Sequence, residues 1–151
     1  MKALVLNASP RKTGNTAKLL KSAADGARDV GAEVEYINLY ELIFTGCRGC
    51  MLCKRKGVER CHCYWKDDLS PIIDKIFHAD VLLIGTAIYL GRPTSRYFEL
   101  LERLHFCSLS YDDYSNYFSV CSTKPLKKSR TALDTRGERL RCFEFDEMAG
   151  I

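Results

Sequence analysis

The stretch that decides the fold is Lys2-Ala-Leu-Val-Leu-Asn-Ala-Ser9-Pro-Arg-Lys-Thr-Gly-Asn-Thr16. Its first half, residues 2–9, is a short apolar run that ends in polar residues, as in a central parallel strand buried on both faces. From Asn15 to Val30, Ala and Leu residues recur three to four positions apart, which predicts a helix with one apolar face. A buried strand that leads through a polar turn into a helix indicates an α/β fold.

The rest of the chain continues this alternation of strands and helices. The sequence predicts strands over residues 33–38, 80–86 and 129–135, and helices from Asp67 or Asp68 to His78 and after Pro93. The run 80–86 is the clearest buried strand. Residues 87–93 are predicted to be a loop, and residues 39–66, which lack periodicity, a long functional loop. Because parallel strands need crossover connections, this order predicts a sheet with helices on both faces.

Length and composition limit the classes of function. With 151 residues the chain has room for about one domain, and 46% hydrophobic with 28% charged residues is ordinary for a globular protein. The net charge of +4 is mild and the basic residues are mostly interleaved with acidic ones, which argues against a nucleic-acid partner. No apolar segment reaches the length of a membrane span and no signal peptide is visible, so we expect no membrane partner and a cytoplasmic location.

One stretch departs from this balance of charge. Residues 124–141 contain seven Lys or Arg residues against two acidic residues, Asp134 and Glu138. A solvated basic surface is the favoured interpretation, and a site for an anionic ligand such as a nucleotide phosphate is the alternative.

The turn at residues 9–16 has the chemistry of a phosphate-binding loop. It supplies hydroxyls from Ser9, Thr13 and Thr16, together with a guanidinium, an ammonium and a glycine. Free amide groups at a helix start and the positive end of the helix dipole favour a dianion there, and Arg11 would add a charge-assisted hydrogen bond. The alternative is a plain strand-to-helix turn in which the Ser and Thr side chains cap the helix.

Three motifs resemble the flavodoxin-like family of NAD(P)H-dependent FMN reductases, and the resemblance runs from Lys2 to about Gly137. The motifs are Ser9-Pro-Arg with Gly14-Asn-Thr16, the cysteine loop followed by Lys66-Asp-Asp68, and Gly85-Thr-Ala-Ile-Tyr-Leu-Gly91. The resemblance implies that the FMN phosphate is held by Ser9, Arg11, Gly14, Asn15 and Thr16. It implies that the isoalloxazine ring lies against Thr86, Ala87, Ile88, Tyr89, Leu90 and Gly91, with a third flavin-side loop at Thr135 and Gly137.

The same resemblance implies a doubly wound parallel sheet with the strand order 2-1-3-4 and a binding crevice at the carboxyl ends of the strands. Residues 1–137 would form a flavodoxin-like FMN-binding domain with its cysteine loop at 46–66, and residues 138–151 an irregular or truncated tail. The family has Pro where this chain has Ala87, and it continues into a fifth strand and a helix that residues 139–151 are too short to supply. The sheet edge left unpaired by the missing fifth strand predicts a homodimer or a higher homo-oligomer.

Five cysteines gather in the long loop, as Cys47-x2-Cys50-x2-Cys53 followed by Cys61 and Cys63. In a chain without a signal peptide, clustered cysteines indicate metal or redox chemistry rather than disulfides. Four thiolates suit a 4Fe-4S cluster because sulfur ligands are soft and anionic, and the spacing resembles that of the iron-sulfur flavoprotein branch of the family. We predict Cys47, Cys50, Cys53 and Cys61 as the metal ligands, with Cys63 as the alternative fourth ligand.

Two other interpretations of the cysteine loop stay open. Zinc is also bound by four thiolates, and His62 would be a possible nitrogen ligand. Alternatively, the loop carries free thiols and no metal, as in cluster-free relatives. Cys107, Cys121 and Cys142 lack neighbours at ligand spacing and are predicted to be buried structural cysteines.

The function implied by the resemblance is an oxidoreductase in which FMN accepts hydride from NADH or NADPH and electrons pass to a small-molecule or protein acceptor. The cofactor supplies the chemistry, so no catalytic side chain is predicted. The second hypothesis is an electron carrier that uses FMN and an iron-sulfur cluster without a small substrate of its own. The third is a truncated remnant that binds neither cofactor stably.

Overall fold

The central strand, β1 (Lys2–Ala8), pairs with parallel neighbours on both sides in the computed structural model, which describes residues 1–59 and 61–108. Its partners are β2 (Glu33–Asn38) and β3 (Val81–Thr86), so the sheet has the order β2-β1-β3. Ala8 lies opposite Thr86, and β1 and β3 therefore end at the same level. The first three strands of the predicted order 2-1-3-4 are confirmed. The predicted strand over 129–135, the loop at Thr135 and Gly137, the basic stretch 124–141 and the tail 138–151 lie outside the described residues.

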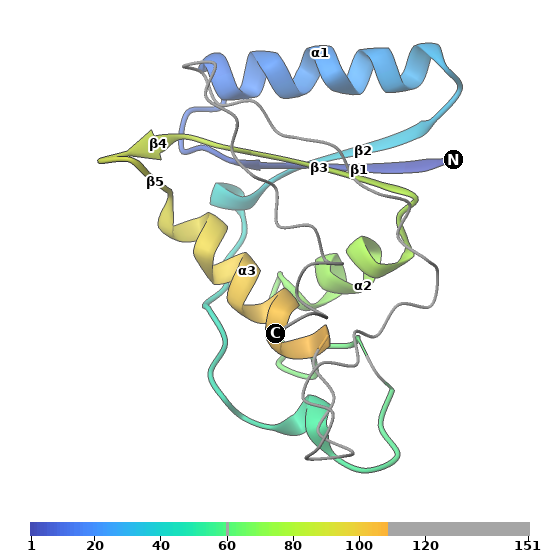
Figure 1. The fold of residues 1–151 in the computed structure, drawn as a ribbon, viewed down its shortest axis with the longest axis vertical. Helices are drawn as coiled ribbons and strands as arrows, with labels where there is room; N and C mark the ends of the chain where they lie inside the picture. The colour runs from blue at the N-terminus through green and yellow to red at the C-terminus, as the bar shows by residue number, and fades with distance from the viewer. Residues whose placement is uncertain (60, 109–151) are drawn as a thin grey trace, which may run out of the picture.

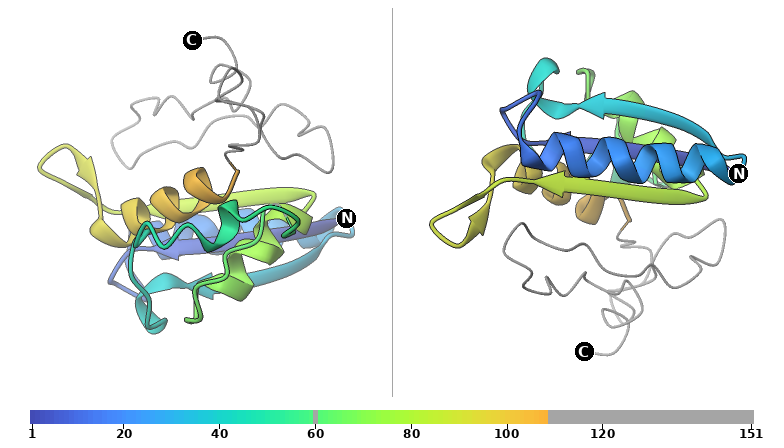
Figure 2. Two further views of the ribbon diagram at one scale, coloured as in Figure 1. Left: turned by 90° about the horizontal axis from the view of Figure 1, so that it is seen from below. Right: turned by 90° about the horizontal axis from the view of Figure 1, so that it is seen from above.

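Helices cover both faces of the sheet and make three layers (Figures 1 and 2). α1 (Asn15–Asp29) lies on one face, and α2 (Ser70–His78) and α3 (Ser95–Ser108) lie on the other. This arrangement is the doubly wound fold that the order of elements predicts.

The segments between these elements contain short ordered structures. Residues 39–66 include two 3-10 helices, η1 (Leu39–Glu41) and η2 (Leu52–Lys54). The predicted loop after β3 is in fact an antiparallel hairpin of β4 (Ile88–Tyr89) and β5 (Arg92–Pro93). A hairpin of two residue pairs is too short to produce an alternating sequence pattern, which explains the wrong prediction.

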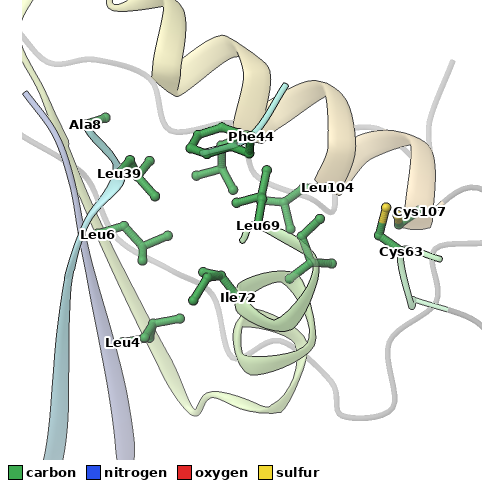
Figure 3. Close-up of a cluster of buried hydrophobic side chains, with 12 residues drawn as sticks. Leu4, Leu6, Ala8, Leu39, Phe44, Cys63, Leu69, Ile72, Leu104 and Cys107 are labelled. Carbon is green, nitrogen blue, oxygen red and sulfur yellow. The ribbon is translucent and has the colours of Figure 1, made fainter. Parts of the chain in front are cut away.

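The core lies mainly between the sheet and the α2 and α3 layer (Figure 3). Leu4, Leu6 and Ala8 of β1 point into this cluster, whereas Val5 points to the opposite face and packs against Leu20 and Ala24 of α1. Alternate residues of one strand are thus buried on both faces, as predicted for a central strand. Each fully buried leucine contributes about 1.5–3 kcal/mol to folding.

β3 differs from the prediction in its burial. The sequence indicates the clearest buried strand of the chain, but all six residues of β3 are partly exposed. The physical reason is its position, because β3 is the last strand of the sheet formed by the described residues.

A close contact between α1 and β3 depends on Gly85. A Cβ atom at this position would lie 2.7 Å from Cδ1 of Leu20 and 3.0 Å from Cγ2 of Thr16. Glycine therefore lets the first turns of α1 approach the sheet, next to the loop that precedes this helix.

Gly85→Ala should lower the free energy of unfolding by about 1–3 kcal/mol, because the added methyl group overpacks the contact with Leu20 and Thr16. Gly26→Ala is the matched control, since nothing lies within 4 Å of a Cβ atom there, inside α1. That change should raise the free energy of unfolding by roughly 0.5–1 kcal/mol through helix propensity. Denaturant unfolding measures both, and equal stability of the two variants would contradict the packing argument.

Candidate functional site

The loop between β1 and α1 is held in shape by its own hydrogen bonds. The amide of the buried residue Ser9 donates to Oδ1 of Asn7 at 3.0 Å. The Ser9 hydroxyl accepts from the Arg11 amide at 3.3 Å, and the Gly14 amide donates to the Arg11 carbonyl at 3.4 Å. These bonds fix the point at which α1 begins, directly beyond the carboxyl end of β1.

The first turn of α1 is open to an anion. Gly14 occupies the N-cap position with an extended backbone, and no side chain caps the helix. This first turn also contains no acidic residue. Uncapped amides and the positive end of the helix dipole make such a turn a receptor for a dianion. The alternative prediction, that the Ser and Thr side chains cap the helix, is therefore not realised.

The structure brings the five predicted phosphate-binding residues together in this loop and first turn. Ser9 and Thr16 are buried at its base, Gly14 is partly buried, and Arg11 and Asn15 are exposed.

Thr94, which the sequence analysis did not single out, connects this loop to the one after β3. Thr94 is 2% exposed and directly precedes α3. Its hydroxyl donates to the Ala8 carbonyl at 2.7 Å, and its amide donates to Oγ1 of Thr86 at 3.1 Å. The ends of β1 and β3 and the start of α3 are thus held at one point. A Thr immediately before an apolar helical pattern is an N-cap signal, and this signal would have identified the residue.

The predicted ring-side residues, 86–91, run from the end of β3 into the β4–β5 hairpin. Leu90 and Gly91 form its turn with φ of 50° and 77°, the two positive values of a type I′ turn. The left-handed conformation is strained for leucine, and the Leu90 side chain is fully exposed at the tip of the hairpin. Tyr89 beside it is also exposed. The hairpin extends beyond the carboxyl edge of the sheet (Figures 1 and 2).

The cysteine loop packs against α3 beside Gly46. A Cβ atom at Gly46 would lie 2.2 Å from Oε2 of Glu102, and the amide of Cys47 donates to the same oxygen at 3.3 Å. A small pocket forms between the loop and the last turns of α3. Arg103 and several aromatic side chains contribute to its lining, together with Cys47, Cys50, Cys53, Cys63 and Cys107.

The cysteines of this pocket overlap with the predicted metal ligands. Cys47, Cys50 and Cys53 belong to its lining, and the fourth cysteine of the loop in the lining is Cys63, the predicted alternative to Cys61. Cys107 is buried, as predicted, but it also lies beside Cys63 at the end of α3 (Figure 3). Sequence spacing could not reveal Cys107, because it lies more than forty residues after the loop and meets it only in the folded chain.

Hydrogen bonds and charges favour thiolates in this pocket. The Cys107 thiol hydrogen-bonds to Cys53 and Cys63 and lowers the pKa of Cys53 to about 6 and that of Cys63 to about 5. The charge of Lys54 acts in the same direction on Cys53, and that of Arg103 on Cys63. The pKa of Cys107 is raised, because its proton is shared with the two thiolates.

A buried ion pair lies directly behind the pocket. Arg103 is 2% exposed, and its guanidinium makes two hydrogen bonds to the Asp67 carboxylate, at 2.7 and 3.1 Å. Burial alone would raise the pKa of Asp67, but Arg103 and the amides of Ser70 and Leu69 outweigh burial and lower it. Asp67 also accepts the amide hydrogens of Leu69 and Ser70 at the start of α2. Asp67 thus binds two amides just before α2, but the N-cap position itself is Leu69 and not Asp67 or Asp68 as predicted.

Several features bear on the metal interpretations. The described cysteines form no disulfide. Within residues 1–59 and 61–108, no group of three or more His, Cys, Asp or Glu side chains is spaced to hold a single metal ion. Nδ1 of His62, the possible nitrogen ligand, lies 2.7 Å from Oδ1 of Asp74 on α2.

The helices of residues 1–59 and 61–108 include none with the length and apolar character of a membrane span.

The fold belongs to a known class. The chain superposes on RosB with bound 8-demethyl-8-formylriboflavin-5'-phosphate at a TM-score of 0.51, with 23% identity over 70% of this chain and 42% of that one. A Streptococcus mutans protein superposes at a TM-score of 0.53, with 17% identity over 74% of this chain and 58% of that one. With the sheet β2-β1-β3 and helices on both faces, the fold is flavodoxin-like.

Residues 1–121 match the family model for NADPH-dependent FMN reductase, and the chain belongs to this family. It is 32% identical to an iron-sulfur flavoprotein of Methanocaldococcus jannaschii, over 68% of this chain and 51% of the relative. It is 35% identical to an iron-sulfur flavoprotein of Archaeoglobus fulgidus, over 68% of this chain and 48% of the relative. The chain thus spans about half the length of these curated relatives.

Asp67→Asn should lower the free energy of unfolding at neutral pH by about 3–5 kcal/mol, because the buried Arg103 charge loses its partner. The pKa of Asp67 is depressed in the folded chain. The stabilisation is therefore present above the unfolded value of about 3.9 and is lost as the pH falls through the lower, folded value. Urea unfolding as a function of pH should show this loss of stability at acid pH in the wild type and not in Asp67→Asn.

The neighbouring residue provides the control for this prediction. The Asp68 carboxylate accepts from the Ile43 amide at 2.7 Å in an exposed position. Asp68→Asn should cost under about 1 kcal/mol and keep the acid dependence of the wild type. An equal loss in the free energy of unfolding for both variants would show that the ion pair between Arg103 and Asp67 has no special role.

Proposed function

We propose that the chain is an FMN-dependent oxidoreductase that accepts hydride from NADH or NADPH and passes electrons to a small-molecule or protein acceptor. The observation that carries this proposal is the uncapped start of α1 beside the ring-side segment, with Thr94 connecting the two. Both lie at the carboxyl ends of parallel strands, where α/β sheets bind their ligands. Membership of the FMN reductase family supports FMN as the flavin and a nicotinamide nucleotide as the donor.

The phosphate would be held by the loop and first turn of α1, through Ser9, Arg11, Gly14, Asn15 and Thr16. The isoalloxazine ring would lie against the segment from the end of β3 to the hairpin tip, which comprises Thr86, Ala87, Ile88, Tyr89, Leu90 and Gly91. When bound, FMN would supply the chemistry of accepting a hydride, while these residues would bind and orient it. The strained, exposed tip at Leu90 is suited to contact a ligand or a second copy of the chain, which supports the predicted homo-oligomer.

We extend the proposal to a 4Fe-4S cluster in the cysteine pocket, held by Cys47, Cys50, Cys53 and Cys63. The donor set fits, because soft thiolates suit such a cluster and the pocket lining favours Cys63 over Cys61. The names of the iron-sulfur flavoprotein relatives support the same group. When bound, the cluster supplies single-electron transfer, which also supports the second candidate function, an electron carrier. Such thiolates persist in a reducing compartment such as the cytoplasm.

Asn15→Asp tests the phosphate site, because it places a negative charge in the first turn of α1. We expect FMN to bind at least about tenfold more weakly, which corresponds to about 1.4 kcal/mol, while the helix itself gains stability from the charge. Riboflavin, which lacks the phosphate, should bind equally well to both proteins. Flavin fluorescence titrations measure these affinities, and an equal loss for riboflavin would contradict the site.

The donor is tested on the same FMN-loaded wild-type protein. In an anaerobic stopped-flow experiment, NADH or NADPH should bleach the flavin absorbance. Loaded protein that reacts with neither nucleotide, but exchanges electrons with a reduced ferredoxin, would favour the electron carrier.

Cysteine variants test the cluster and its fourth ligand. Cys63→Ser should lose most of the iron and the broad visible absorption of anaerobically reconstituted protein, since it removes a ligand. Cys61→Ser is the matched control, because Cys61 is equally buried in the same segment, and it should retain both. Metal analysis separates iron from zinc, and wild-type protein without either metal would favour free thiols.

A further inference from the structure

Arg103 lines the cysteine pocket, and one of its N–H groups has no hydrogen-bond acceptor of good geometry among the described residues. An arginine side chain has five N–H donors, and its Nη atoms account for four of them. Nη1 donates to Oδ2 of Asp67 and to the Thr45 carbonyl, at 2.7 and 3.1 Å. Nη2 donates to Oδ1 of Asp67 at 3.1 Å and to the Ser70 hydroxyl at 3.0 Å. Nε is buried and has no hydrogen-bond acceptor among the described residues.

An unpaired, buried N–H group of a cation is costly, so this group indicates an acceptor that completes the site. Arg103 and Cys63 both line the cysteine pocket, so the guanidinium and this sulfur face the same small space. The bonds to Asp67, Thr45 and Ser70 fix the plane of the guanidinium and therefore the direction of Nε–H. The lining of this pocket includes five cysteines, whose sulfur atoms can accept a hydrogen bond.

Building on the cluster in the proposed function, we propose that Arg103 is a positioning residue whose Nε–H hydrogen-bonds to the sulfur of Cys63 and raises the reduction potential of the cluster. The reduced cluster carries one more negative charge than the oxidised one. A cation and a hydrogen bond at a ligand sulfur stabilise the reduced cluster more than the oxidised cluster. Both are recognised determinants of the reduction potential of a cluster. Arg103 thus acts through Cys63 and is not itself a ligand.

Two substitutions separate the charge of Arg103 from its Nε–H group. Arg103→Gln removes both and should shift the potential to more negative values. Arg103→Lys keeps a charge but lacks the Nε–H group, and it should give a smaller shift in the same direction. The measurement is an anaerobic redox titration of the reconstituted protein, followed by the visible absorption and by the electron paramagnetic resonance signal of the reduced cluster.

Arg96→Gln is the matched control for a structural effect of losing an arginine from α3. Arg96 donates to the Phe44 carbonyl at 2.8 Å and pairs with Glu99 at 3.0 Å, so it also holds the segment before the cysteine loop. The reduction potential of the cluster in Arg96→Gln should equal that in the wild type. The inference is overturned if Arg103→Gln shifts the potential no more than Arg96→Gln, or if Arg103→Lys equals the wild type.

A measurement on the wild type covers the case in which the Arg103 variants do not fold. Resonance Raman spectra of protein reconstituted in H2O and in D2O should show deuterium-sensitive iron–cysteine stretching bands, as expected for an N–H donor to a ligand sulfur. Bands without such sensitivity would overturn the inference. If the wild type holds the cluster but the Arg103 variants leave its reduction potential unchanged, only the role of Arg103 is refuted. If the wild type holds no cluster, both the proposed cluster and this inference are refuted.

Discussion

The ion pair between Arg103 and Asp67 is the interaction on which the arrangement of the α2 and α3 layer depends. It connects three segments, because Arg103 lies on α3, Asp67 precedes α2, and the Thr45 carbonyl belongs to the chain that enters the cysteine loop. Desolvation offsets much of the attraction between two buried charges, so such a pair adds little net stability compared with apolar residues of the same size. Its effect is to exclude other arrangements, since any shift of the loop or of α2 leaves a buried charge without a partner.

The two candidate sites lie at opposite ends of α3. Thr94, just before this helix, holds the carboxyl ends of β1 and β3 where the flavin is proposed to bind. Arg103 and Cys107, in its last turns, line the cysteine pocket. The helix has 14 residues and is therefore roughly 20 Å long. One rigid element thus sets the distance between the sites, and the buried pair at one end and Thr94 at the other fix its position.

The features that the sequence predicted are those encoded by neighbouring residues. The apolar run at 2–9 predicts the central strand, and the turn at 9–16 predicts where the first helix begins, because both depend on local pattern and hydrogen bonding. The missed features depend on contacts between distant segments. Thr94 meets Ala8 across 86 positions and Arg103 meets Asp67 across 36, and neither pair leaves a periodic signal. A buried arginine on an apolar helix face even opposes the pattern that sequence analysis seeks.

The choice between Cys61 and Cys63 shows how backbone conformation adds to spacing. In an extended chain, residues two apart point to the same side, so spacing alone treats the two cysteines as equivalent. Cys61 has a φ of 58°, in the left-handed region, which breaks this alternation. His62, between them, contacts Asp74 of α2 and anchors the segment to that helix. Cys63 then follows at the position that meets Cys107 of α3, and this geometry, rather than the count of residues, selects it as the sulfur that faces the pocket.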